Sequence, residues 1–140
     1  MGRYLIDTNI FIEMNRDPAL LSRDIWAVLS DYENQIFISV ESLKELVHMY
    51  NTKQWMHKIW PSKRQMIASV SELFQIQSLP VTTDVVEKYA DMFINTFQHH
   101  NDPSDHIIVA QALLMNLTLI SDDNKFSYYR NQGLQLIENE

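Results

Sequence analysis

The chain has 140 residues, of which 46% are hydrophobic and 21% are charged, and its formal net charge is −7 at pH 7. This length and balance are typical of one globular domain with a single core, so we expect one domain over residues 1–140. Disulfides, thiolate metal sites and cysteine nucleophiles are excluded because the chain has no cysteine. The sequence shows neither a long apolar run nor a signal peptide, and we therefore expect a cytoplasmic protein without membrane contact.

The first half of the chain alternates short apolar strands with helices. In chain order it predicts a strand over residues 3–7, helices over 8–14 and 19–32, and a strand over 36–39. The two helices are separated by Asp17-Pro18, because the residue before a proline disfavours helical backbone. Apolar residues then recur at helical spacing from Val40 to Tyr50, and Pro61 opens the next helix. The apolar side of that next helix carries Met66, Ile67, Val70, Leu73 and Phe74.

The second half continues the same alternation. It predicts a strand over residues 75–79, helices over 83–98 and 103–116, and strands over 117–121 and 134–137. Strands that alternate with helices indicate an α/β/α sandwich around a mainly parallel sheet of four to five strands. The whole chain has two glycines and no phosphate-cradling loop, so Walker and dinucleotide-binding motifs are excluded.

Acidic residues stand near the ends of predicted strands, in a helix that follows a strand, or at the start of the helix predicted over residues 103–116. They are Asp7 in LID, Glu45 in SVESLKEL, Asp102 and Asp105 in NDPSD, and Asp123 in LISDD. A parallel sheet gathers the carboxyl ends of its strands at one edge, so these carboxylates could meet in one crevice. Packed together they would repel by roughly 4 kcal/mol per pair at about 4 Å and an effective dielectric near 20. A divalent cation relieves that repulsion, and oxygen ligands of this kind suit Mg²⁺ or Mn²⁺.

Each acidic residue also has a purely structural explanation. Asp7 could cap the helix that follows it, and Glu45 could be a solvated acid on the polar side of its helix. The sequence Asp102-Pro103-Ser104-Asp105 has the form of a capping box, and Asp123 could form an Asx turn. Singly, each residue is ambiguous. Their common placement favours metal-dependent phosphoryl chemistry.

A basic segment lies between Glu45 and Glu72, where the chain has no acidic residue. It contains two tryptophans and six basic residues, namely Trp55, Trp60, His48, His57, Lys53, Lys58, Lys63 and Arg64. Aromatic and cationic side chains interleaved in this way could stack on single-stranded bases and contact RNA phosphates. Alternatively, the segment forms amphipathic helices whose tryptophans belong to the core or to a dimer interface.

Several short motifs resemble those of PIN-domain proteins, and more narrowly those of the VapC-type toxins of type II toxin–antitoxin pairs. In chain order these motifs are Leu5-Ile6-Asp7-Thr8-Asn9-Ile10, Ser39 with Glu45-Leu46, Asp102-Pro103-Ser104-Asp105 leading into residues 108–112, and residues 121–126. Together they extend over almost the whole chain. The resemblance implies a single PIN-like domain.

The resemblance also assigns roles to individual residues. It implies four catalytic acids, which are Asp7, Glu45, Asp105 and Asp123. Of these, the implied metal ligands are Asp7, Asp105 and Asp123. The implied supporting residues are Thr8, Asn9, Asp102 and Ser121. Two positions depart from the family pattern, because His106 replaces a frequent arginine and Ser121 replaces a more usual threonine.

The implied function is a ribonuclease in which Mg²⁺ or Mn²⁺ activates the water that cleaves RNA internally and leaves a 5′-phosphate. The chain would be the toxin of a toxin–antitoxin pair, form a homodimer and bind a cognate antitoxin. Its possible RNA contacts are His106, Lys53, Lys58, Lys63 and Arg64. Its expected exposed apolar residues, available to a protein partner, are Trp55, Met56, Trp60 and Phe97.

Three alternatives stay open at this point. A haloacid-dehalogenase-type phosphatase would need a second acid where Asn9 stands and a lysine before the last acidic pair, yet no lysine lies between Lys88 and Lys125. A phospho-acceptor receiver domain would need an acid after a central strand and a lysine after a late strand, and neither is in place. A PIN fold could also be a catalytically silent binding scaffold, although the four acids count against that.

Overall fold

Residues 1–73 and 75–140 are described by the computed structural model. Five strands of the described residues form one sheet, namely β1 (Arg3–Ile6), β2 (Gln35–Ser39), β3 (Gln77–Leu79), β4 (Thr118–Ser121) and β5 (Gln135–Glu138). The strand order is β3-β2-β1-β4-β5, and every neighbouring pair is parallel. The predicted, mainly parallel sheet of four to five strands is therefore confirmed. β2 and β3 extend the sheet on one side of β1, and β4 and β5 extend it on the other.

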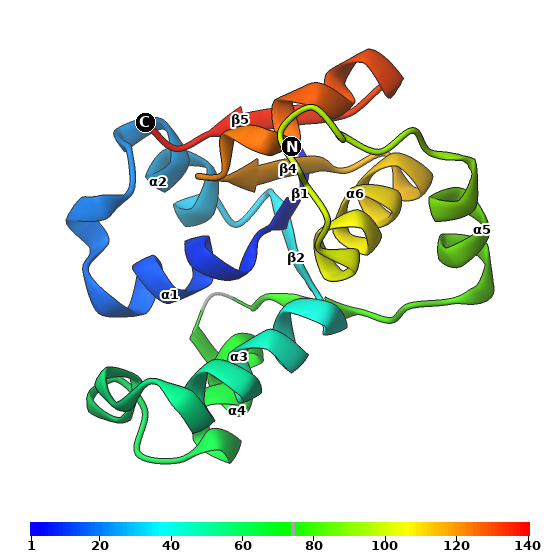
Figure 1. The fold of residues 1–140 in the computed structure, drawn as a ribbon. Helices are drawn as coiled ribbons and strands as arrows, with labels where there is room; N and C mark the ends of the chain where they lie inside the picture. The colour runs from blue at the N-terminus through cyan, green and yellow to red at the C-terminus, as the bar shows by residue number, and fades with distance from the viewer. Residues whose placement is uncertain (74) are drawn as a thin grey trace.

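Six α-helices and three 3-10 helices of the described residues surround the sheet. The α-helices are α1 (Thr8–Arg16), α2 (Arg23–Ser30), α3 (Val40–Thr52), α4 (Lys63–Leu73), α5 (Thr83–Asp91) and α6 (Pro103–Met115). The 3-10 helices are η1 (Pro18–Leu20), η2 (Gln54–Lys58) and η3 (Asn124–Gln132). In Figure 1, α1, α3 and α4 lie on one side of the sheet, and α5 and α6 lie on the other.

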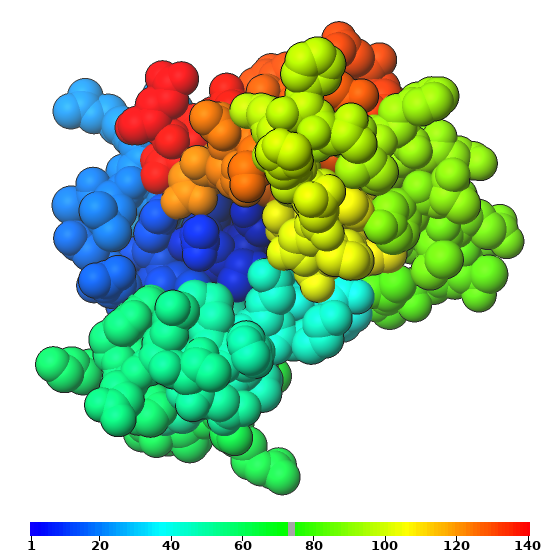
Figure 2. Space-filling model, viewed as in Figure 1, coloured from blue at the N-terminus to red at the C-terminus, as the bar shows by residue number. Residues whose placement is uncertain are grey.

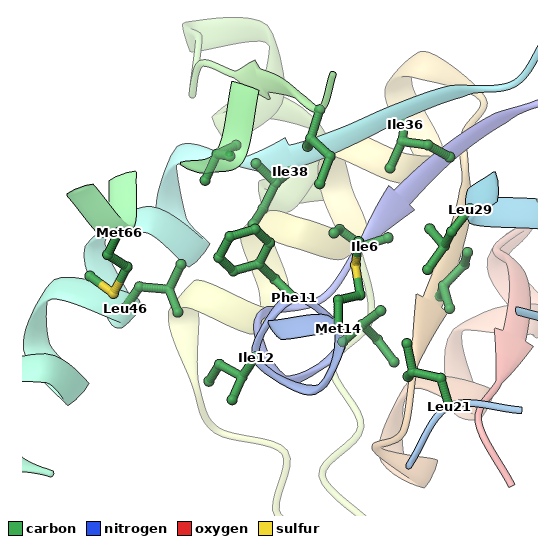
Figure 3. Packing of buried hydrophobic residues seen from close by; sticks show 14 of the residues in the cluster. Ile6, Phe11, Ile12, Met14, Leu21, Leu29, Ile36, Ile38, Leu46 and Met66 are labelled. Atoms are coloured by element: carbon green, nitrogen blue, oxygen red, sulfur yellow. The ribbon is translucent and has the colours of Figure 1, made fainter. Parts of the chain in front are cut away.

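The strands divide their side chains between two apolar cores. Ile6 and Ile38 belong to the core that also contains residues of α1–α4, and Figure 3 shows both beside Phe11 of α1. Leu5 and Phe37 belong to the core formed with α6 and η3. Alternate residues of a strand face opposite sides of the sheet, so near-continuous apolar strands are required where both sides are covered.

Two predicted helices have different limits in the structure. The helix predicted over residues 19–32 is divided, because η1 and a serine N-cap precede α2. The helix predicted over residues 83–98 ends as α5 at Asp91. Beyond it, the side chain of Gln132 in η3 donates to the carbonyl of Phe93 and accepts from its amide, at 2.8 and 2.9 Å. These bonds from a distant element satisfy backbone groups that a longer helix would have paired internally.

Two residues that were expected to be exposed, Trp60 and Met56, belong to the core. Trp60 is 4% exposed and stacks on a phenylalanine of α1 with ring centres 5.7 Å apart, and Met56 is fully buried. Trp55 is partly exposed, and the guanidinium of Arg16 lies over its ring. The two tryptophans therefore do not form a common surface for stacking bases. Phe97 is exposed, as expected.

The apolar side of α4 packs as its helical spacing predicts where the structure describes it. Met66 and Val70 are buried. Phe74 and the side chain of Leu73 lie outside the described part of the chain, so their place on that side stays a prediction. Among the described residues, no helix is both long enough and apolar enough to cross a membrane.

Candidate active site

Four segments that are far apart in the sequence meet at the carboxyl edge of the sheet, beside β1 and β4. They are the start of α1, the second turn of α3, the start of α6 and the turn after β4. Figure 2 shows the corresponding blue, cyan, yellow and orange surfaces meeting near the centre of this face. The strand order reverses its direction here, between β1 and β4. Open α/β sheets bind ligands at such a switch point.

Asp7 is the most buried of the predicted acids and accepts two hydrogen bonds. Its Oδ1 accepts from the backbone amide of Thr8 at 2.8 Å, and its Oδ2 accepts from the Ser121 hydroxyl at 2.8 Å. The residue is 6% exposed. Asp7 is the N-cap of α1, as the capping interpretation predicted, but its carboxylate also reaches the end of β4.

Two buried hydroxyl groups connect acids of different elements. The Ser121 hydroxyl donates to Asp7 and accepts from the backbone amide of Asp123 at 3.0 Å. The Thr8 hydroxyl donates to Glu45 Oε1 at 3.1 Å, which joins α1 to α3. Both residues are buried, so bulk water does not compete for these hydrogen bonds. The positions of the carboxylates are therefore coupled to one another through the protein.

Asp105 belongs to two groups of side chains that could hold a metal ion. The ligand atoms of Glu45, Asp102 and Asp105 lie within 4.8 Å of one another, and the same holds for His100, Asp105 and Asp123. Asp102 is the N-cap of α6 and Asp105 lies in its first turn, whereas Asp123 is the N-cap of η3. The structure thus confirms that Asp102 caps a helix and that Asp123 forms an Asx turn, in which its side chain accepts from the amide of Lys125 at 2.9 Å. Both residues also stand beside Asp105.

Burial and mutual repulsion raise the pKa values of two acids, Asp7 and Glu45. Burial, followed by the charge of Asp105, raises the pKa of Asp7 to about 7, although the hydrogen bonds that Asp7 accepts act in the opposite direction. Burial also raises the pKa of Glu45 to about 7, with further contributions from Asp105 and Asp102. Asp7 and Glu45 therefore retain protons at a pH where isolated carboxyl groups release them. Crowded oxygen donors of this kind fit a divalent cation such as Mg²⁺ or Mn²⁺.

The structure places the other predicted residues outside this cluster. Asn9 is exposed, and its side chain makes no hydrogen bond to any described residue. His106 is 4% exposed, with its Nδ1 2.7 Å from the Tyr89 hydroxyl and its Nε2 2.6 Å from the carbonyl of His100. Because both ring nitrogens are engaged inside the protein, the expected RNA contact of His106 is not supported. The predicted basic contacts are exposed around η2 and at the start of α4, at Lys53, Lys58, Lys63 and Arg64.

Two residues beside the acids are absent from the sequence prediction. His100 is 2% exposed, and its Nε2 lies 2.9 Å from Asp105 Oδ2. Glu13 of α1 shares a hydrogen bond with Asp122, and burial followed by this contact raises the pKa of Glu13 to about 8. The position of His100 directly before the NDPSD motif was a usable signal. Glu13 lies within an ordinary amphipathic helix, and nothing in its local sequence distinguishes it.

Comparisons with known proteins relate nearly the whole chain to one fold. The PIN domain family model matches residues 4–131. The structure is similar to that of VapBC2 from Rickettsia felis bound to a promoter DNA fragment, with 19% identity, a TM-score of 0.68 and 99% of each chain covered. It is also similar to VapBC-5 from Mycobacterium tuberculosis (20% identity, TM-score 0.63, 99% of each chain) and to FitAcB from Neisseria gonorrhoeae (18% identity, TM-score 0.66, 96% of each chain). A search of the curated proteins found no match.

Proposed function

Because this chain belongs to the PIN domain family, we propose that it is a metal-dependent endoribonuclease and the toxin of a type II toxin–antitoxin pair. The observation that carries this proposal is the group of ligand atoms around Asp105, contributed by α3, by the segment that leads into α6, by α6 itself and by the turn after β4, at the carboxyl edge of the sheet. The raised pKa values of Asp7 and Glu45 support it, because perturbed carboxyl groups in a crevice are typical of functional sites.

We assign the metal ligands to Asp7, Asp105 and Asp123, and the ion to Mg²⁺ or Mn²⁺. Carboxylate oxygens suit both ions. Mn²⁺ is the more informative probe, because it is paramagnetic and shows whether the nearby imidazole of His100 coordinates it. When bound, such an ion makes a coordinated water more acidic and offsets the negative charge of the scissile phosphate.

The surrounding residues have separate tasks in this proposal. Ser121 and Thr8 hold the carboxylates of Asp7 and Glu45 through the hydrogen bonds that they donate. Glu45, whose pKa is raised to about 7, suits the uptake of a proton from the attacking water near neutral pH. The amino end of α6 carries partial positive charge toward the same edge, which favours a bound phosphate group.

The proposed partners are RNA, a cognate antitoxin and a second copy of the chain, with the cytoplasm as the place of action. VapBC-5, one of the similar structures, is described as a member of a family of toxin–antitoxin systems. Phe93 and Phe97 are 74% and 91% exposed, and such apolar side chains are candidates for a protein interface. The exposed basic residues around η2 stay the candidates for contact with the RNA backbone.

The first prediction is that purified protein with Mn²⁺ or Mg²⁺ cleaves RNA, leaves 5′-phosphate ends and is stopped by EDTA. Asp105→Asn should slow cleavage by roughly 100-fold or more, because it removes a charged ligand from the centre of the cluster. Asp84→Asn is the matched control, since Asp84 is an exposed acid in the first turn of α5, and it should cleave at the native rate. The readout is the rate of product formation on a mixed RNA substrate.

Two results would contradict this prediction. Products ending in 2′,3′-cyclic phosphates would show that the ribose hydroxyl, not water, attacks the phosphate. A metal-loaded protein that leaves a broad set of RNAs intact would favour a binding scaffold over a nuclease.

A further inference from the structure

A buried chain of hydrogen bonds reaches Asp105 from the protein interior. It begins at the backbone amide of Asn95, which donates to the Tyr129 hydroxyl at 3.2 Å. The Tyr129 hydroxyl lies 3.2 Å from Nδ1 of His100, and Nε2 of His100 lies 2.9 Å from Asp105 Oδ2. This series of hydrogen bonds thus connects the loop after α5, the 3-10 helix η3 and the first turn of α6.

The donors in this series of hydrogen bonds determine which ring nitrogen of His100 carries the hydrogen. A phenolic hydroxyl has a single hydrogen, and the Tyr129 oxygen already accepts from the Asn95 amide. The Tyr129 hydrogen is therefore available to Nδ1 of His100, which leaves the hydrogen of the neutral ring on Nε2. In the other tautomer, the Tyr129 oxygen would accept two bonds and its hydrogen would find no acceptor among the described residues.

The imidazole ring of His100 is also confined by aromatic neighbours. Phe126 meets it edge-on at 5.1 Å between ring centres, and His106 meets it edge-on at 5.4 Å. His106 also contacts the carbonyl of His100 at 2.6 Å, so the backbone of His100 is held as well as its ring. At 2% exposure, this ring is a fixed donor. Its Nε2 hydrogen is aimed at Asp105.

We propose that His100 is a positioning residue, which fixes the orientation of the Asp105 carboxylate by donating a hydrogen bond from Nε2 to Oδ2. Among the described residues, the other oxygen, Oδ1, accepts no hydrogen bond, so it is left for a cation. This inference rests on the proposed function, because Asp105 is a metal ligand only within it. Groups that hydrogen-bond to ligating carboxylates typically change metal affinity or activity by roughly 10–100-fold when removed.

The tautomer of His100 is tested first, on the native metal-free chain and without any substitution. Long-range ¹H–¹⁵N NMR of the histidine rings should place the His100 hydrogen on Nε2. A hydrogen on Nδ1 alone would overturn the inference, because Nε2 could not then donate to Asp105. Tyr129→Phe removes the hydroxyl that selects the tautomer but keeps the ring, and it should increase the population of the Nδ1 form.

The second measurement is Mn²⁺ affinity by calorimetry, with two amides that replace the imidazole. The amide nitrogen of Gln lies three bonds beyond Cβ, as Nε2 does, so His100→Gln should bind Mn²⁺ within about 3-fold of native. The amide of Asn lies two bonds beyond Cβ, as Nδ1 does, so His100→Asn should bind about 10-fold more weakly or worse. His99→Asn is the control, since His99 is exposed at a positive φ that asparagine tolerates, and it should bind as native.

Pulsed electron paramagnetic resonance of the bound Mn²⁺ separates positioning from direct ligation. A positioning role predicts no ¹⁴N coupling from a coordinated imidazole, and such a coupling would overturn the inference. If the native chain bound no Mn²⁺, or if Asp105→Asn bound it as tightly as native, the proposed function would fail together with this inference. If the native chain and His100→Asn bound Mn²⁺ equally well, this inference alone would fail.

Discussion

Asp7 is both a helix cap and a member of the acidic cluster, and these two roles affect stability in opposite directions. As the N-cap of α1 it contributes about 1 kcal/mol, the usual value for a capping side chain. As a buried acid beside Asp105 it resists ionisation, and its pKa is raised to about 7. The folded chain therefore holds a proton on Asp7 that the unfolded chain releases at a lower pH.

The second prediction is that the metal-free protein loses stability as the pH rises from about 4 to about 8, because the raised pKa values of Asp7, Glu45 and Glu13 all lie in or at the end of this window. The sign follows from linkage, because in this window the folded state binds more protons than the unfolded state. Asp7→Asn should make the profile shallower, since Glu45 and Glu13 still contribute to it, and should raise the unfolding free energy above pH 7 by roughly 1–3 kcal/mol. Denaturant titrations in EDTA between pH 5 and 8 measure both effects.

The exposed Asp84→Asn variant is again the control and should keep the native profile. A native protein that gains stability across the window would contradict the linkage argument. An Asp7→Asn variant that is less stable than native at every pH would show that the capping role outweighs the repulsion.

At the scale of elements, the segment between α5 and α6 is held in place by hydrogen bonds from η3 as well as by hydrogen bonds of its own. Gln132 of η3 binds both backbone groups of Phe93, and the Asn95 amide donates to Tyr129. His100 follows in the same segment and contacts Asp105. The position of η3 is thus coupled to the acidic cluster, although the side chain of Gln132 does not touch it.

The third prediction concerns this coupling. Gln132→Ala removes both bonds to Phe93 and should lower the unfolding free energy by about 1 kcal/mol. Faster amide hydrogen exchange should be confined to the segment from α5 to α6. Asn131→Ala, an exposed neighbour in η3, is the control and should exchange as native. Equal exchange in both variants would show that Gln132 does not hold the segment.

At the scale of the whole molecule, the acidic edge is both the proposed site of cleavage and a surface that attracts cations. An antitoxin that inserts an arginine or lysine there would compete with the metal and silence the enzyme. The proposed toxin role therefore joins catalysis and inhibition at one place on the molecule.

The fourth prediction is that expression of this chain alone slows bacterial growth and that co-expression of a cognate antitoxin from a neighbouring gene restores it. Asp7→Asn should be harmless because it removes a proposed metal ligand, yet it should elute at the same size as native in gel filtration. A variant that is as toxic as native would show that toxicity does not come from this site. A harmless variant that elutes at a different size would point to misfolding instead.

The sequence by itself determined the order of strands and helices, and it identified most of the acids at the candidate site. Apolar runs such as Ile36–Ile38 predict buried strands because both faces of a parallel sheet are covered. Asp7 and Asp123 could be placed at the same edge because parallel strands end together. Such inferences need only local patterns and one rule of topology.

The tertiary structure decided which side chains are covered and which of them touch. Trp60 is buried because η2 folds it onto α1, and α5 ends at Asp91 because η3 supplies the competing hydrogen bonds. His106 and His100 are adjacent to the same acidic motif, yet the ring of His106 is engaged inside the protein, whereas Nε2 of His100 lies 2.9 Å from Asp105. Each of these outcomes depends on partners from distant elements or on the direction of a side chain, and a local pattern of residues does not contain either.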